Sequence, residues 1–172
     1  MRENRMRLRY TLSAATGALL LTTLLAPTAS AGASVGSAKL LNSDLEAVRA
    51  EPDPTEPGGS TLLRATVVNH GPDTTGGPFT LTVRLPLGAE AEEPFFPDTC
   101  RLAILSSGHT VRCTFPRGLP ANASVTADIP VRISPNAPVG DLEGGSTQAT
   151  ALLYDRNPSN NRAPFTLRVV EA

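Results

Sequence analysis

The sequence predicts an all-β protein, with short antiparallel strands folded into one sandwich or barrel. Apolar and polar residues alternate with a period of two at 79–85, 125–133 and 165–169. Successive side chains of a strand point to opposite faces of a sheet, so this alternation is typical of strands that are buried on one side. The chain also contains 14 glycines and 16 prolines, many of them between these segments. Many short strands separated by turn residues indicate a sandwich or a barrel.

The length and the net charge of the chain favour a single domain and argue against a nucleic-acid-binding protein. The chain has 172 residues, with 15 lysines and arginines against 16 aspartates and glutamates. This length fits one domain. Arginine is preferred over lysine, and alanine, glycine and proline are abundant, which indicates a GC-rich bacterial genome. The sequence has no run of basic residues, so we expect no nucleic-acid partner.

The first 31 residues have the pattern of an export signal. Four arginines precede an apolar segment at Leu12–Ala26, Pro27 ends that segment, and Ala29–Ala31 has the small residues that a signal peptidase accepts. The apolar segment is shorter than the ~20 residues of a membrane-spanning helix. We therefore expect 1–31 to be a signal peptide, cleaved to release a secreted or envelope-associated protein that is not embedded in the membrane. An uncleaved N-terminal anchor is the alternative.

The remaining chain divides into a short lead-in and one domain. Residues 32–43 are small and polar, and we expect them to be a flexible lead-in to a domain at 44–172. Turn residues such as those at 56–59 separate the expected strands. Pro130 falls inside one strand, and because proline has no N–H to donate, we expect it at a sheet edge or a bulge. The expected strands are 45–50, 61–69, 79–85, 100–105, 110–115, 125–133, 148–155 and 165–169.

The two cysteines are expected to form a disulfide within one hairpin. If the chain reverses at Ser106–Ser107, Cys100 faces Cys113 and Leu102 faces Val111. Two cysteines placed in this way in an exported protein should be oxidised, with a redox-active pair as the alternative. Closing a loop of this size stabilises the fold by roughly 3 kcal/mol in the chain-entropy model. The buried face of the hairpin would carry Cys100, Leu102, Ile104, Val111, Cys113 and Phe115.

The sequence offers little that could carry catalysis. His70 and His109 both fall in expected turns, and with the cysteines oxidised they cannot complete a zinc site of the usual nitrogen and sulfur kind. The motifs of serine hydrolases, phosphate-binding loops and zinc proteases are missing. The carboxylates at 90–98 could form an acid pair for glycoside hydrolysis, but their proline-rich setting favours a solvated loop. We therefore expect no enzyme activity, no cofactor and no well-defined metal site.

Phe95 and Phe96 are the candidate partner contact. They lie between two prolines in an irregular segment, where two adjacent rings cannot both point inward easily. The rings therefore either cover the core or form a tip that binds another molecule. We take the loop at 88–99 as the preferred contact surface.

The segment 155–161 resembles the start of a calcium-binding loop. Oxygen-bearing side chains occupy the first, third and fifth positions, but Asn160 stands where such a loop needs glycine and Thr166 where it needs glutamate. Asp and Asn side chains also stabilise turns by bonding to their own backbone. The segment is therefore either a turn between strands or a weak calcium site. The candidate ligands are Asp155, Asn157 and Ser159.

Two motifs carry a family resemblance. The stretch Asn69-His70-Gly71-Pro72-Asp73, followed by an alternating strand and Leu85-Pro86-Leu87-Gly88, is similar to the pattern N-x-G-P-(S/D) and then L-P-x-G. The closing segment at 155–161 reads D-x-N-P-x-N-N. With the two cysteines between them, these motifs make residues 44–170 resemble the bacterial surface repeat known as domain of unknown function eleven. The bacterial cell-adhesion-related domain is the second choice.

The resemblance implies an immunoglobulin-like β-sandwich of about seven to eight strands, found in exported or envelope proteins, with no established catalytic residues. It also implies tandem copies, whereas this chain carries one copy. We expect a secreted, non-enzymatic module for extracellular or cell-envelope interaction or adhesion, whose partner is an unknown protein or envelope component. The alternative is a secreted calcium- or carbohydrate-binding module that uses the turn at 155–161.

Overall fold

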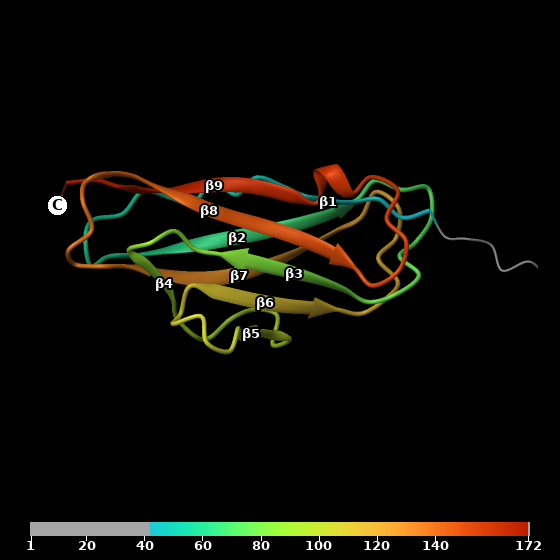
Figure 1. Cartoon of the computed structure of the whole chain (residues 1–172), viewed down its shortest axis with the longest axis horizontal. Coiled ribbons are helices and arrows are strands. Elements are labelled where there is room, and N and C mark those ends of the chain that lie inside the picture. The colour runs from blue at the N-terminus through green and yellow to red at the C-terminus, as the bar shows by residue number, and fades with distance from the viewer. Residues whose placement is uncertain (1–41, 172) are drawn as a thin grey trace, which may run out of the picture. The chain divides into compact units, whose positions relative to one another are not determined.

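The computed structural model describes residues 42–171 and confirms the all-β, immunoglobulin-like sandwich (Figure 1). One antiparallel sheet has the order β1-β2-β7-β4, and the other has the order β5-β6-β3-β8-β9. The nine strands of the described part are β1 (Leu45–Ala47), β2 (Ser60–Asn69), β3 (Phe79–Arg84), β4 (Ala89–Ala91), β5 (Cys100–Leu102), β6 (Thr110–Phe115), β7 (Ser124–Ile133), β8 (Gly140–Ala151) and β9 (Arg162–Val169), with one short 3-10 turn, η1 (Pro158–Asn160).

The expected signal peptide at 1–31 lies outside the described residues, as does most of the expected lead-in, and both stay predictions. Ordered contacts of the domain already include Ser43, whose Oγ donates a hydrogen bond of 2.9 Å to the Tyr154 carbonyl. Among residues 42–171 there is no helix with the length and apolar character needed to cross a membrane.

Strands β1 and β5 end three residues earlier than expected and β9 begins three residues earlier, but the largest differences from the expectation are in β4 and β8. Strand β4 was not expected, and it lies inside the expected loop at 88–99. The sequence does not predict it because three residues are too few to show an alternating pattern. Strand β8 begins at Gly140 rather than at residue 148, and it ends at Ala151 rather than at 155. Its first half is polar and glycine-rich, and a bulge between Leu142 and Gly145 shifts the register. A bulge places two residues opposite one and so interrupts the alternation on which the expectation relied.

The core lies between the two sheets and is built from the inward-facing alternate residues of the strands. The rings of Phe79 and Phe115 stack there with their centroids 5.2 Å apart. Burying each large apolar side chain stabilises the fold by about 1.5–3 kcal/mol. The largest fully buried side chains are Phe79, Phe165, Leu45, Leu63, Leu81, Ile129, Ile133, Leu167, Val67, Val83, Val111 and Val131.

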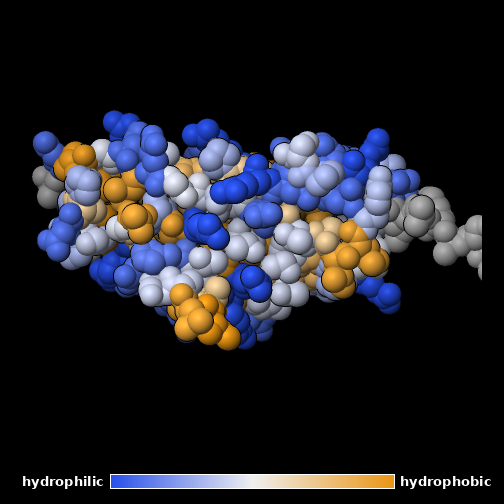
Figure 2. Space-filling view, viewed as in Figure 1, coloured by the Kyte–Doolittle hydropathy of each residue, from blue (hydrophilic) through white to orange (hydrophobic). Residues whose placement is uncertain are grey.

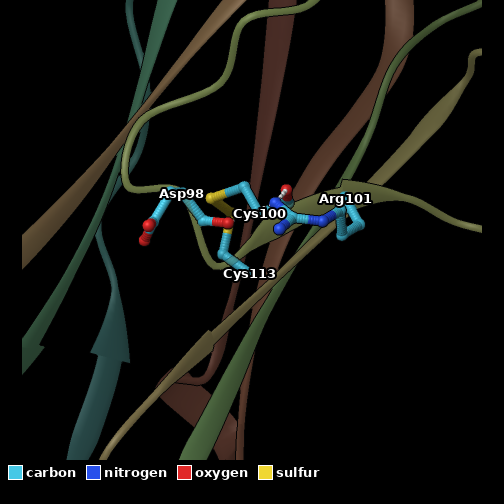
Figure 3. Close-up of a disulfide and its surroundings, with 4 residues drawn as sticks. All are labelled: Asp98, Cys100, Arg101 and Cys113. Carbon is cyan, nitrogen blue, oxygen red and sulfur yellow. Dashed lines mark hydrogen bonds between the residues drawn. A yellow bond between two sulfur atoms is a disulfide. The ribbon is translucent and has the colours of Figure 1, made fainter.

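The disulfide between Cys100 and Cys113 is confirmed, as is the register that placed these residues opposite each other and Leu102 opposite Val111 (Figure 3). The expectation that Leu102 and Ile104 are buried with the cysteines is wrong, because 39% and 92% of their surfaces are exposed. Strand β5 ends at Leu102, and the Ser106 N–H bonds back to the Ala103 carbonyl at 3.2 Å. The chain therefore turns away from the core before residue 104.

Pro130 lies in β7, which has β2 on one side and the short β4 on the other. The Glu92 N–H donates to the Pro130 carbonyl at 2.9 Å. Because the N–H and C=O of a residue in an antiparallel strand face the same neighbour, the missing N–H of Pro130 also faces this side. Pro130 therefore lies just past the end of β4, where the ladder of hydrogen bonds between β4 and β7 has already ended and the missing N–H interrupts no pairing.

Candidate functional site

Asn69, the first residue of the N-x-G-P-D motif, is a buried structural centre at the end of β2. Its Oδ1 accepts hydrogen bonds from the N–H groups of Asp44, at 3.0 Å, and Gly71, at 3.1 Å. Its Nδ2 donates to the carbonyls of Asp73, at 2.9 Å, and Leu119, at 3.0 Å. The side chain is completely buried, and its bonds satisfy backbone groups in buried or part-buried positions.

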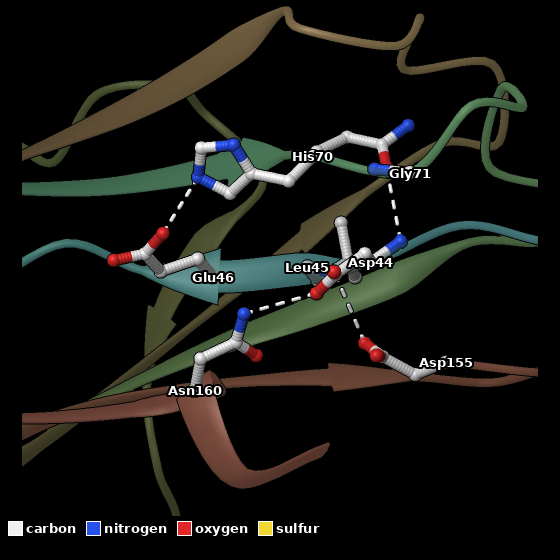
Figure 4. Close-up of polar contacts among 8 residues, drawn as sticks. Asp44, Leu45, Glu46, His70, Gly71, Asp155 and Asn160 are labelled. Carbon is white, nitrogen blue, oxygen red and sulfur yellow. Dashed lines mark hydrogen bonds and ion pairs between the residues drawn. The ribbon is translucent and has the colours of Figure 1, made fainter. Parts of the chain in front are cut away.

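The surroundings of Gly71 explain why the same motif has a glycine at this position. A Cβ atom at this position would lie 2.2 Å from the Asn42 carbonyl oxygen and 2.7 Å from the Asp44 nitrogen. Only glycine lets the two backbone segments approach this closely. Next to it, His70 Nε2 lies 2.6 Å from a carboxylate oxygen of Glu46 on β1 (Figure 4). The motif therefore holds the chain as it enters β1.

The 155–161 segment fastens the same stretch from the other sheet (Figure 4). The carboxylate of Asp155 accepts hydrogen bonds from the Leu45 N–H, at 3.1 Å, and from the Asn157 N–H, at 3.0 Å. Asn160 Nδ2 donates to the Asp44 carboxylate at 2.9 Å. These contacts support the interpretation of the segment as a turn, because its oxygen atoms bond to the protein's own backbone and amides.

The two family-like motifs thus converge on one short stretch, residues 42–46. We call this arrangement the β1 clasp; it consists of residues 42–46, Asn69, Gly71, Asp155 and Asn160. Two buried side-chain oxygens accept no hydrogen bond from the described residues, namely Oδ1 of Asn160 in the clasp and Oδ1 of the neighbouring Asn161. The clasp joins two distant parts of the sequence to the stretch that leads into β1, through hydrogen bonds within the protein.

The candidate contact residues Phe95 and Phe96 have different environments. Phe95 is partly buried and packs against the core, which is the first of the two alternatives given for it, and a contact with a partner stays a prediction. Phe96 is 67% exposed, although its backbone is fixed by two hydrogen bonds with Asp128, at 3.1 and 2.8 Å. Adjacent side chains of an extended segment point in opposite directions, so one ring faces inward and the other outward.

Further exposed apolar side chains follow Phe96 along the chain. Leu105 is 98% exposed, and its backbone has a φ of +65°, which is the left-handed region. Figure 2 shows a hydrophobic patch near the place of β5 in Figure 1, and the exposed large apolar residues of this part of the chain are Phe96, Leu102, Ile104 and Leu105. We call the segment 92–105 the β4–β5 edge. Sequence reasoning missed most of this patch because it placed Leu102 and Ile104 in the core.

A third feature is a cleft of about 370 Å³ beside β4, lined among others by Leu87, Glu90, His109 and Arg132. His109 Nδ1 lies 2.8 Å from the Ala89 carbonyl oxygen, so it acts as the donor in this contact. The hydrogen bond and the negative charge of Glu92 raise the pKa of the Arg132 guanidinium. The cleft combines residues from distant segments, which the sequence alone could not bring together.

Of the candidate catalytic side chains, the described structure brings Glu90 and His109 to one cleft, beside β4. In the described part of the chain, no three side chains of His, Cys, Asp or Glu are grouped so as to hold a metal ion. His70 bonds to Glu46 and His109 to the Ala89 carbonyl, so the two histidines have separate partners. The carboxylates at 90–98 include Glu92, which bonds to Arg132 at 2.5 Å.

Comparisons with known proteins give remote likenesses. No protein-family model and no curated protein matches the sequence. A CARDB domain of the PF1109 protein of Pyrococcus furiosus, solved with di-metal ions, is 15% identical over 78% of this chain and 100% of its own, with a TM-score of 0.47. A non-cellulosomal cohesin of Archaeoglobus fulgidus is 12% identical over 74% of this chain and 92% of its own, with a TM-score of 0.47.

A type I cohesin–dockerin complex of Clostridium thermocellum contains a chain that is 12% identical over 77% of this one and 99% of its own, with a TM-score of 0.49. At these identities and TM-scores, the three likenesses carry no conclusion about the function of this chain. The resemblance to domain of unknown function eleven stays a prediction.

Proposed function

We propose that the chain is an exported, non-enzymatic interaction module that binds a protein or envelope component through the β4–β5 edge. The carrying observation is Leu105, an almost fully exposed leucine with a φ of +65°. A left-handed backbone costs a residue with a Cβ about 1–2 kcal/mol. Neither burial nor backbone preference explains a leucine there, and such local conflicts are typical of functional positions.

The surroundings of Leu105 suit a contact surface. Phe96 and Ile104 are also exposed, so the β4–β5 edge carries several exposed apolar side chains. The disulfide joins β5 to β6, the Phe96 backbone is bonded to β7, and the Ala103 N–H donates to the Thr110 carbonyl at 2.8 Å, so the edge is fixed from Phe96 to Ala103. A fixed surface loses little conformational freedom on binding, and this loss is a main cost of association. Exposed apolar groups of this kind mark interaction sites.

The test compares retention on the envelope of the producing cells. In the variant Phe96→Ser/Ile104→Ser/Leu105→Asn, asparagine tolerates the left-handed backbone, so the fold should persist. We expect the fraction of protein retained on washed cells to fall by about tenfold or more, since each lost apolar contact weakens binding by roughly 1 kcal/mol. The matched control is Leu152→Ser/Leu153→Ser, which removes two exposed leucines next to β8. Equal retention of both variants and the unaltered protein would refute the proposal.

A second candidate function, weak calcium binding at the 155–161 turn, is favoured by the two buried amide oxygens of Asn160 and Asn161 that lack a donor. A cation or a water molecule would satisfy them. Calorimetric titration of the protein with calcium distinguishes a bound cation from a bound water molecule. Heat of binding that disappears in the variant Asn161→Ala supports a cation, and no heat together with an unchanged melting temperature dismisses it.

A further inference from the structure

The outer side of the five-stranded sheet carries an excess of positive charge. The outward positions of β5, β6, β3, β8 and β9 include five arginines and only two carboxylates. Most of the other outward residues are threonines. We call this surface the arginine–threonine face. Its charged residues are Arg84, Arg101, Arg112, Arg162, Arg168, Asp141 and Glu143.

The strand register sets three of the arginines in one row. Arg101 pairs with Arg112, Arg112 with Thr82, Thr82 with Gln148, and Gln148 with Arg162. Neighbouring strands lie about 4.8 Å apart, so the row spans roughly 19 Å. Arg84 lies on the same face, two residues along β3 from Thr82. Residues from five separate segments therefore form one basic surface.

The arginines of this row are poorly neutralised. Arg101 stands directly opposite Arg112, and like charges in this position destabilise a sheet. Arg101 Nη1 donates to the carbonyls of Asp98 and Cys100 (Figure 3). Among residues 42–171, no carboxylate forms an ion pair with Arg84, Arg112 or Arg162. The exception on this face is Arg168, which lies 3.8 Å from Asp141.

The outer side of the four-stranded sheet provides the contrast. Its outward charged residues comprise two arginines and three carboxylates, and both arginines have acidic partners. Arg64 lies 3.9 Å from Asp128, and Arg132 lies 2.5 Å from Glu92. Unpaired arginines are therefore a property of one face and not of the whole surface.

The shape of the arginine–threonine face suits an extended ligand. A shallow cleft of about 380 Å³ is lined by Thr99, Arg101, Arg112 and Thr114, among others. A second cleft, of about 190 Å³, shares Thr114 and continues along Thr80 and Thr150. In Figure 2, strongly hydrophilic side chains are interspersed with weakly polar ones across this view. The face therefore offers guanidinium groups and hydroxyl groups side by side.

We propose that the arginine–threonine face binds a linear acidic polysaccharide. Guanidinium groups bind carboxylate, phosphate or sulfate with paired hydrogen bonds, and threonine hydroxyls can both donate to and accept from sugar hydroxyls. No aromatic residue occupies an outward position of these five strands, so the face lacks the stacking platforms that single-stranded nucleic acids use. This face adjoins the β4–β5 edge and shares Thr99 and Arg101 with it, but Arg84 and Arg112, which test the proposal, lie outside that edge.

The test uses polygalacturonate as the probe, with neutral dextran, polyglutamate and duplex DNA as comparisons. We expect the protein to bind polygalacturonate, and added salt to weaken this binding because it screens the charges. Neutral dextran should not bind. Polyglutamate and DNA should bind at least about tenfold more weakly. Neither polymer presents rows of sugar hydroxyl groups that could bond to the threonine hydroxyls of the face. Equal affinity for polyglutamate or DNA would overturn the choice of ligand.

The arginines are tested with Arg84→Gln/Arg112→Gln, which removes two guanidinium groups without an ion-pair partner in the described structure. The matched control is Arg64→Gln/Arg156→Gln, which changes the net charge equally but lies outside this face. We expect the first variant to lose affinity for polygalacturonate by about tenfold or more, and the control by less than about twofold. Equal losses would show that net charge alone is responsible, and no loss in either variant would also refute the site.

Discussion

The β1 clasp and the β4–β5 edge lie at opposite lateral sides of the sandwich, because β1 and β4 end one sheet while β9 and β5 end the other. At the clasp, buried polar side chains bond to backbone groups, and little apolar surface is exposed. At the β4–β5 edge, a disulfide joins the strands, and Phe96, Ile104 and Leu105 are exposed.

The comparison shows that a conspicuous motif and an available surface need not coincide. The clasp contains both motifs of the family resemblance, yet Asn69 and Asp155 use their polar atoms to hold β1. The edge contains no motif, yet it leaves apolar side chains in contact with water. Substitutions in the clasp should therefore change stability, and substitutions at the exposed edge should change binding.

The largest expected effect is on the clasp. Asn69→Ala removes the acceptor of the Asp44 and Gly71 N–H groups and the donor to the Asp73 and Leu119 carbonyls at a buried site, so we expect the free energy of unfolding to fall by about 3–5 kcal/mol. Denaturant unfolding measures the change. Asn136→Ala is the control, because Asn136 is exposed, and it should alter stability by less than about 0.5 kcal/mol. A loss under about 1 kcal/mol for Asn69→Ala would contradict the role of the clasp.

The next effect concerns the covalent bond that supports the edge. Cys100→Ala/Cys113→Ala removes a disulfide that closes a separation of 13 residues, and we expect a loss of about 3 kcal/mol. Thermal unfolding of the variant and of the unaltered protein, both under oxidising conditions, gives the difference. If the melting temperatures agree, the disulfide contributes nothing to the stability of this edge.

A smaller effect is expected at the second half of the clasp. Asp155→Ala removes the acceptor of the Leu45 and Asn157 N–H groups, and we expect a loss of about 2 kcal/mol in the absence of calcium. Chemical unfolding with a chelator present measures it. An effect that appears only when calcium is added would instead assign Asp155 to a metal site.

The smallest effect is expected at the exposed edge itself. Ile104→Ser/Leu105→Asn should change the free energy of unfolding by less than about 0.5 kcal/mol, because both side chains already contact water. The same denaturant curve serves as the measurement. A loss of about 2 kcal/mol would show that these residues pack against the domain in solution, and the contrast between clasp and edge would disappear.

Much of the fold could be predicted because its signal is local. The alternation at 79–85 and 125–133 identifies strands and their buried faces, and β3 and β7 confirm both. The hairpin register that pairs Cys100 with Cys113 follows from the short distance between them in the sequence. Strand β4 and the first half of β8 could not be predicted, since one is very short and the other contains a bulge.

The candidate sites were predicted less well, because they depend on which segments become neighbours. Nothing in the sequence indicated that the Asp155 carboxylate bonds to the Leu45 N–H, 110 residues away. Phe95 and Phe96 were treated as a pair, but the backbone bonds between Phe96 and Asp128 fix one ring outward while the other packs on the core.

By itself, the sequence determined where the strands of clear alternation run, which of their residues face inward and which cysteines pair. These properties depend on a period of two residues and on contacts close in the chain. Only the tertiary structure decided the neighbours of the outward-facing residues. The arginine–threonine face exists because the register of five strands places dispersed arginines on one surface, and the order of strands in a sheet is set by long-range packing that no local pattern records.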